Sequence, residues 1–204
     1  MSDQGSRPPA KVVLIGLMGS GKTTVGKKLA KLTGIPFVDA DVALEARSGR
    51  SVADWFSEGE DAFRNAEVDL LATLLDADEP IVVGAGGGVV VSPANRERLQ
   101  AADVTAVYLH GEPAFLASRT QAKPHRPLLH DRDPRLVFEQ LYTARDGLYR
   151  SVADAVVEIQ PAHLAGEKPK WRIAETVVEA LVDLGVLDPR TDGEPKTKRM
   201  EGPK

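Results

Sequence analysis

The chain of 204 residues contains no cysteine, and this absence excludes several kinds of chemistry. Without thiols there are no disulfides, no thiolate nucleophile and no cysteine-ligated zinc or iron–sulfur cluster. The formal net charge of −4 provides no general surface for polyanions, so we do not expect nucleic acid as a partner. The chain must therefore rely on an ordinary hydrophobic core, and its composition fits a cytoplasmic protein.

Long apolar runs are also missing. The longest, residues 81–91, is interrupted by glycines and falls short of the roughly 18 residues that cross a bilayer. Residues 1–10 are polar and lack the apolar stretch of a secretory signal, so we predict a flexible N-terminus and no membrane partner. Residues 188–204 are rich in proline, glycine and charge and are expected to be a disordered tail. One domain over residues 11–187 remains.

Within this domain, short β-branched runs alternate with stretches of helical periodicity, which is typical of an α/β protein with a parallel sheet. We expect five strands, at residues 11–15, 36–38, 80–83, 104–109 and 155–159. A helix should follow the first strand, and further helices are predicted at residues 61–75, 92–101, 113–119, 133–150 and 171–184. Loops are expected at residues 121–133 and 160–170.

The most specific motif follows the first predicted strand and reads Gly16-Leu17-Met18-Gly19-Ser20-Gly21-Lys22-Thr23-Thr24. It matches every position of the P-loop pattern, in which backbone N–H groups and a helix N-terminus surround phosphate oxygens. The dinucleotide fingerprint fails because Thr24 occupies its third glycine position, which argues against NAD. We predict that Lys22 reaches the β- and γ-phosphates and that the Thr23 hydroxyl binds Mg²⁺.

Two carboxylates, Asp39 and Asp41, follow the second predicted strand. Alternate residues of an extended segment share one side, and open α/β sheets bind ligands in the crevice beyond their strands. One carboxylate near Mg²⁺ and one near a substrate hydroxyl would suit phosphoryl transfer. The alternative is a solvated loop or a helix N-cap, a position that aspartate favours. The spacing of the pair favours the functional interpretation.

A glycine-rich run, residues 84–88, follows the third predicted strand. Such a run suggests that the backbone passes close to a group that leaves no room for side chains; a ligand ring is one candidate and a flexible turn is the alternative. Arginine forks suit carboxylates and phosphates, but spacing alone does not choose among the arginines. The four histidines show no HExxH spacing, so we predict no catalytic or metal-binding histidine.

Together these motifs resemble the shikimate kinases, a family within the nucleoside monophosphate kinase-like P-loop proteins, over about residues 11–184. The similarity rests on the P-loop, Asp39-Ala40-Asp41, Glu60 with Phe63-Arg64, Gly86-Gly87-Gly88, Arg126-Pro127-Leu128-Leu129 and Arg145 before Leu148-Tyr149. Many NTPases share the P-loop, whereas the other motifs in this order are specific. The resemblance implies a three-layer αβα P-loop kinase fold with a five-stranded parallel sheet in the order 2-3-1-4-5. It also implies transfer of the ATP γ-phosphoryl group to the 3-hydroxyl of shikimate, in aromatic amino-acid biosynthesis.

The resemblance further implies a role for each site residue. The catalytic residues would be Lys22, Asp41 and Arg126. ATP would be bound by Gly19, Ser20, Gly21, Lys22, Thr23, Thr24, Arg119 and Arg126, with Arg119 stacking on adenine. Shikimate would be bound by Asp41, Arg64, Gly86, Gly87, Gly88 and Arg145, with the last arginine and Arg64 on its carboxylate. Mg²⁺ would be held by Thr23 and, through water, by Asp39. The resemblance implies a monomer with a substrate-binding region at about residues 41–70 and a lid at about residues 120–133.

Two departures from the family pattern stand out: residues 57–60 form a turn one residue shorter than usual, and Asp146-Gly147 replaces a common proline. The segment at residues 160–170 is longer than usual, so the family's adenine contacts are not carried over there. Two alternatives remain open. One is a gluconate-type sugar-acid kinase, against which the motifs argue. The other is a non-catalytic nucleotide-binding module, against which the retention of every expected catalytic side chain argues.

Overall fold

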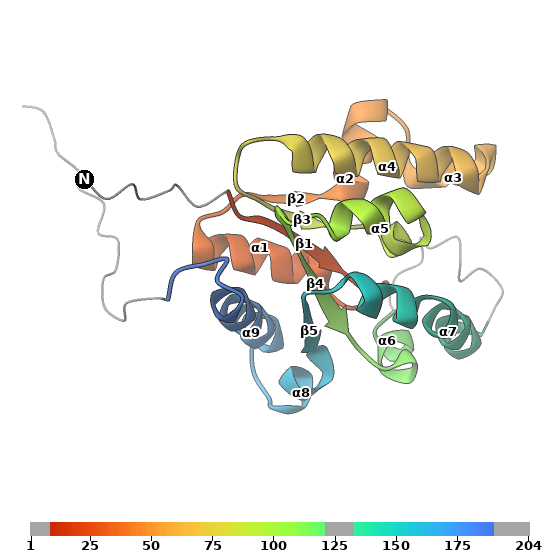
Figure 1. The fold of residues 1–204 in the computed structure, drawn as a ribbon. Coiled ribbons are helices and arrows are strands. Elements are labelled where there is room, and N and C mark those ends of the chain that lie inside the picture. Colours follow the sequence, from red (N-terminus) through yellow and green to blue (C-terminus); the bar gives the residue numbers. More distant parts are fainter. Residues whose placement is uncertain (1–8, 121–132, 190–204) are drawn as a thin grey trace, which may run out of the picture.

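The computed structural model describes residues 9–120 and 133–189 (Figure 1). Most of the predicted lid, with Arg126, and most of the predicted flexible ends lie outside the described residues. The described residues form a five-stranded sheet in the order β2-β3-β1-β4-β5 between two layers of helices, which confirms the predicted fold. None of the helices in these two ranges is long and apolar enough to cross a bilayer.

Every neighbouring pair of strands is parallel. The central strand β1 is buried along its whole length, because helices cover both faces of the sheet. All five predicted strands are present, with ends that differ by at most one residue from the predicted ones. Their bounds are β1 Lys11–Ile15, β2 Phe37–Asp39, β3 Ile81–Gly84, β4 Val104–His110 and β5 Ala155–Glu158.

The six predicted helices are present as α1 Lys22–Thr33, α4 Glu60–Asp76, α5 Pro93–Leu99, α6 Pro113–Thr120, α7 Pro134–Val152 and α9 Pro169–Asp183. Figure 1 shows α1 and α9 side by side on one face of the sheet, with α4 and α5 on the other. Four shorter helices were not predicted: α2 Ala40–Ser48, α3 Val52–Glu58, the 3₁₀ helix η1 Val89–Val91 and α8 Ile159–Leu164.

The helix α8 corrects the predicted loop at residues 160–170, whose first half is helical. Pro161 lies in the first turn of α8. A backbone N–H there has no intrahelical acceptor, so a proline costs little. The helix α2 is a second correction, because the chain leaves its extended conformation at Asp39, before Asp41.

The helix α1 packs closely on β2 at Gly26, where a Cβ atom would overlap the ring of Phe37. We therefore expect Gly26→Ala to lower the free energy of unfolding by about 1–3 kcal/mol, the usual cost of overpacking a core. Gly147→Ala in α7 is the matched control, since a Cβ there would meet nothing within 4 Å. That variant should raise stability by up to about 1 kcal/mol, because alanine favours the helix. Urea unfolding of both variants measures the difference, and equal effects would contradict this account of the packing.

Candidate active site

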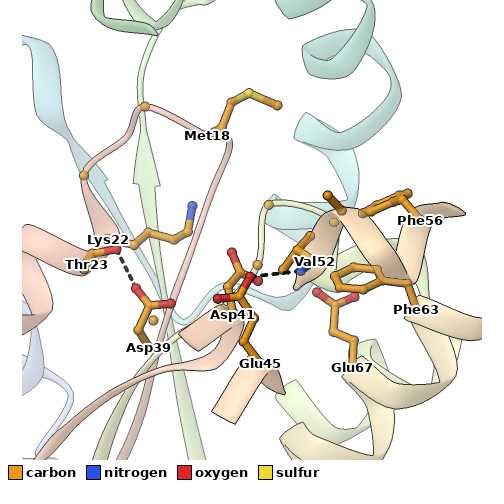
Figure 2. A pocket seen from close by; sticks show the side chains of 18 of the residues that line it. Met18, Lys22, Thr23, Asp39, Asp41, Glu45, Val52, Phe56, Phe63 and Glu67 are labelled. Atoms are coloured by element: carbon orange, nitrogen blue, oxygen red, sulfur yellow. Dashed lines mark hydrogen bonds between the residues drawn. The ribbon is translucent and has the colours of Figure 1, made fainter. Parts of the chain in front are cut away.

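One pocket of about 880 Å³ collects most of the predicted site residues (Figure 2). It lies at the carboxyl ends of β1, β2 and β3, where open α/β sheets bind their ligands. The predicted residues that line it are Gly19, Gly21, Lys22, Thr23, Thr24, Asp39, Asp41, Arg64, Gly86, Gly87, Gly88, Arg119 and Arg145. The side chain of Ser20 is instead fully buried beneath the loop, and Arg126 lies outside the described residues.

The P-loop connects β1 to α1, as the sequence predicts. Its turn depends on Gly21, which caps α1 in the left-handed conformation at φ 96° and ψ 19°. The Lys22 ammonium donates to the carbonyl oxygens of Gly16, at 2.7 Å, and Leu17, at 3.1 Å, so its side chain lies across the loop. The N-terminal N–H groups of α1 and the Lys22 charge therefore face the same pocket, an arrangement that suits anionic phosphate.

Asp39 makes one contact that fits each of the two interpretations that the sequence left open. Its Oδ1 caps α2 by accepting from the Val42 N–H at 3.4 Å. Its Oδ2 accepts from the Thr23 hydroxyl at 2.6 Å (Figure 2). Hydroxyl and carboxylate oxygens beside a P-loop fit Mg²⁺, which prefers oxygen ligands. Over the described ranges no three carboxylate or imidazole groups gather into a metal site, so a cation at Thr23 would need oxygens from phosphate and water as well.

Asp41 lines the pocket from the first turn of α2, rather than from an extended segment as predicted. Its side chain is accessible to solvent, yet the walls of the pocket surround it. This partial burial raises the pKa of the carboxyl group; the Lys22 and Arg64 charges oppose the shift, whereas the Asp39 and Glu45 carboxylates add to it. Asp41 is thus a carboxylate of increased basicity on the pocket wall.

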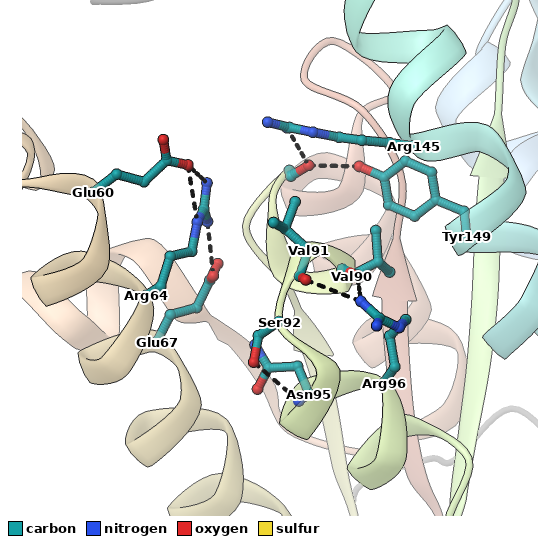
Figure 3. Close-up of polar contacts among 11 residues, drawn as sticks. Glu60, Arg64, Glu67, Val90, Val91, Ser92, Asn95, Arg96, Arg145 and Tyr149 are labelled. Atoms are coloured by element: carbon teal, nitrogen blue, oxygen red, sulfur yellow. Dashed lines mark hydrogen bonds and ion pairs between the residues drawn. The ribbon is translucent and has the colours of Figure 1, made fainter.

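Arg64 is held on α4 by two carboxylates of the same helix (Figure 3). Its guanidinium donates to Glu60 at 2.9 Å and to Glu67 at 2.8 Å. The Glu67 side chain is buried, which raises the pKa of its carboxyl group against the opposing charge of Arg64. Its Oε1 has no hydrogen-bond partner among the described residues. Glu67 is not among the predicted site residues, although its i+3 spacing from Arg64 on a predicted helix indicates the pair.

The glycine run is shaped by protein side chains. A Cβ at Gly86 would lie 2.5 Å from Glu67 Oε1, and a Cβ at Gly88 would overlap the Arg64 guanidinium. The backbone between them is anchored at the Gly87 carbonyl oxygen, which accepts from Arg145 at 2.9 Å and from the Tyr149 hydroxyl at 2.5 Å (Figure 3). These contacts argue against the flexible-turn alternative, and they place Arg64 and Arg145 on either side of the run.

Arg119 lies at the other end of the pocket, in the last turn of α6. Its Nε donates to the Gly19 carbonyl oxygen at 3.2 Å, which joins α6 to the P-loop. Partial burial lowers the pKa of its guanidinium. The predicted residues therefore divide into a P-loop end with Arg119 and an opposite end with Arg64 and Arg145, and Asp41 lies between them.

The model of the family described as shikimate kinase matches residues 18–181. The chain belongs to the shikimate kinase family. It is 42% identical over 176 residues to the shikimate kinase of Halorhodospira halophila. The aligned residues make up 86% of this chain and 95% of that one. Among solved structures it resembles the shikimate kinase from Acinetobacter baumannii in complex with shikimate, with a TM-score of 0.78 and 32% identity. That likeness covers 86% of this chain and 94% of the other.

A gluconokinase from Sinorhizobium meliloti also resembles the chain, with a TM-score of 0.57 and 21% identity over 87% of this chain and 94% of the other. This likeness shows a shared fold alone. The shikimate kinase relatives are more similar in both sequence and structure, which confirms the predicted family over the sugar-acid kinase alternative.

Proposed function

We propose that this protein phosphorylates the 3-hydroxyl of shikimate with the γ-phosphoryl group of ATP, giving shikimate 3-phosphate and ADP in aromatic amino-acid biosynthesis. The observation that carries the proposal is a single pocket with a P-loop at one end and two guanidinium groups at the other. The first suits a nucleotide and the second a carboxylate. Membership of the shikimate kinase family supports the choice of acceptor. The protein acts as a cytoplasmic monomer in this proposal.

The nucleotide occupies the P-loop end. Backbone N–H groups from Gly19 to Thr24, including that of Ser20, bind the phosphates, and Lys22 reaches the β- and γ-phosphates. Arg119 stacks on adenine from α6. Thr23, and Asp39 through water, hold Mg²⁺, which neutralises charge on the phosphates when bound.

Shikimate occupies the opposite end. Arg64 and Arg145 bind its carboxylate, and the backbone from Gly86 to Gly88 lines one side of its ring. Glu60 and Glu67 hold the Arg64 fork in place, so less side-chain entropy is lost when the acid binds. Asp41 then lies beside the ring hydroxyls, between the acid and the nucleotide.

Asp41 orients the 3-hydroxyl and accepts its proton as the hydroxyl oxygen bonds to the γ-phosphorus and the bond to the ADP oxygen breaks. Its raised pKa makes it a better proton acceptor than an ordinary aspartate. A loose phosphoryl transition state needs more positioning and charge neutralisation than proton removal, and Lys22 supplies part of that neutralisation. In this proposal Arg126, which lies outside the described residues, adds a second positive charge to the transferred group.

An ADP-release assay tests this function. The protein is incubated with ATP and Mg²⁺ and with shikimate, gluconate or no acceptor, and the product is identified by mass. We expect ADP release that depends on shikimate, with a product heavier by one phosphoryl group. ADP release that depends on gluconate would show that shikimate is not the acceptor. If neither acid increases the release of ADP, the result would support the non-catalytic alternative.

Gly88→Ala tests the carboxylate end, because the new methyl group would displace the Arg64 guanidinium. We expect the KM for shikimate to rise by about 10-fold to 100-fold, because the carboxylate would lose a charge-assisted hydrogen bond. The KM for ATP should stay unchanged. Gly147→Ala, with open space around its Cβ, is the control. Steady-state kinetics with each substrate varied in turn measures both constants, and an equal rise in both would argue against a local effect on Arg64.

A further inference from the structure

Lys170 is a pocket residue to which the proposed mechanism gives no role. It lies in the first turn of α9, and α9 packs along α1, the helix that follows the P-loop. This packing brings the Lys170 ammonium against the loop: a Cβ placed on Gly21 would lie 2.5 Å from Lys170 Nζ. A second lysine therefore reaches the phosphate-binding turn from the far end of the chain.

The Lys170 ammonium has no partner in the part of the chain that the structure describes. Its Nζ is buried and forms no hydrogen bond there. An ammonium group has three donors, and leaving them unpaired away from water costs stability. This arrangement does not stabilise the fold, whereas an anionic ligand would pair the charge.

The surroundings of Lys170 favour an anionic ligand. Within residues 9–120 and 133–189, the ionisable groups that act on it are Arg119 from α6 and His163 from α8, and Lys28 of α1 lies over the neighbouring ring of Trp171. None of these is acidic. Burial, with a smaller contribution from Arg119, lowers the pKa of Lys170 to about 8, so the group is still mostly charged at neutral pH. Burial also lowers the pKa of His163, which keeps that ring neutral.

We propose that Lys170 binds the α- or β-phosphate of the nucleotide, as a second P-loop cation beside Lys22. Backbone groups of a P-loop surround these two phosphates, and Gly21 belongs to that loop. A phosphate oxygen held there lies within reach of an ammonium group packed on Gly21. The inference rests on one part of the proposed function, that the P-loop binds ATP, and is independent of the identity of the acceptor.

Calorimetric titration of the full-length protein tests the contact, with ADP and inorganic pyrophosphate as probes. Lys170→Met removes the charge, Lys170→Arg keeps it, and Lys31→Met removes an exposed charge at the far end of α1 as a control. We expect Lys170→Met to weaken ADP and pyrophosphate binding by about 10-fold to 100-fold. In Lys170→Arg and Lys31→Met, the affinities for ADP and pyrophosphate should stay within about threefold of those of the unchanged protein.

A stability measurement separates binding from a structural role. Because the unpaired ammonium destabilises the folded chain, Lys170→Met without nucleotide should raise the melting temperature by about 2 °C or more. The ADP affinity of the unchanged protein should fall as the pH rises from 7.5 to 9.5, while Lys170 loses its proton, and this fall should be smaller in Lys170→Met. A purely structural lysine would instead give a lower melting temperature and no change in the pH profile.

Three results would overturn the proposal. One is unchanged ADP affinity in Lys170→Met. Another is weaker ADP binding with unchanged pyrophosphate binding, which would move the contact to the adenosine part of the nucleotide. The third is an equal loss in Lys170→Met and Lys170→Arg, because shape and not charge would then matter. None of these depends on shikimate turnover, so a failure of the proposed acceptor leaves the Lys170 test intact.

Discussion

Asp41→Asn is expected to lower kcat with shikimate by about 10²-fold to 10⁴-fold, the usual contribution of a positioned proton acceptor. The substitution keeps the size of the side chain but removes both its charge and its basicity. Asp41 lines the pocket from α2 and not from the P-loop, so the affinity for ADP should stay within about threefold of that of the unchanged protein. Steady-state turnover and calorimetric ADP binding measure the two effects separately. Loss of ADP affinity to the same extent as kcat would mean that Asp41 acts on the nucleotide.

Glu45→Gln is the matched control for Asp41→Asn. Glu45 lies one turn later on α2 and also lines the pocket, but its Oε1 accepts from the Val52 N–H at 2.9 Å at the start of α3. An amide oxygen can keep this hydrogen bond. We expect kcat to change by less than about threefold, because the proposed reaction depends on the Asp41 carboxylate and not on the overall negative charge of the pocket. A loss equal to that of Asp41→Asn would favour a bulk electrostatic effect over a specific role.

The raised pKa of Asp41 also predicts a pH dependence. In the proposed function the reaction needs the ionised form of Asp41, so kcat/KM should fall as the pH decreases through a value above 3.8, the ordinary pKa of aspartate. The residual activity of Asp41→Asn should lack this acidic limb. Burial disfavours the ionised group in the folded protein, so at neutral pH the substitution should raise the melting temperature slightly. A gain in stability with a loss of turnover is the combination expected of a group kept for function.

The fold and the position of the P-loop between β1 and α1 could be predicted from the sequence because their signals are local. A buried parallel strand is apolar along its length, and the P-loop is a contiguous pattern between that strand and a helix. Both patterns can be recognised from neighbouring residues in the sequence, without knowing which distant residues are in contact. The predicted strand ends differ from the observed ones by at most one residue for the same reason.

The remaining site residues depend on packing that no local pattern records. Glu67 is buried because α4 covers the glycine run, and Lys170 reaches the P-loop because α9 lies along α1. The glycine run indicated a close approach but not the partner, which proves to include Arg64 and Glu67. The short helix α2 was missed because Asp39 and Asp41 fit both an extended segment and a capped helix.

Lys22→Met is expected to lower kcat by about 10²-fold to 10³-fold, the usual loss on removing one group that stabilises developing charge. Lys22 lies across the P-loop in hydrogen bonds to the Gly16 and Leu17 carbonyl oxygens, so its ammonium is positioned before the phosphates arrive. Turnover at saturating ATP and shikimate is the measurement. Lys170→Met provides the contrast, since a lysine that acts in nucleotide binding should change ADP affinity more than kcat.

Lys22→Met should have a second effect, on Asp41. The Lys22 charge is the largest influence that lowers the pKa of Asp41 against its burial. Removing that charge should raise the pKa further, so the acidic limb of the residual kcat/KM profile should move to higher pH. The same limb in Lys31→Met should not move, because that exposed lysine lies at the other end of α1. An unchanged limb in Lys22→Met would mean that the two groups titrate independently and that Asp41 is not the base behind the profile.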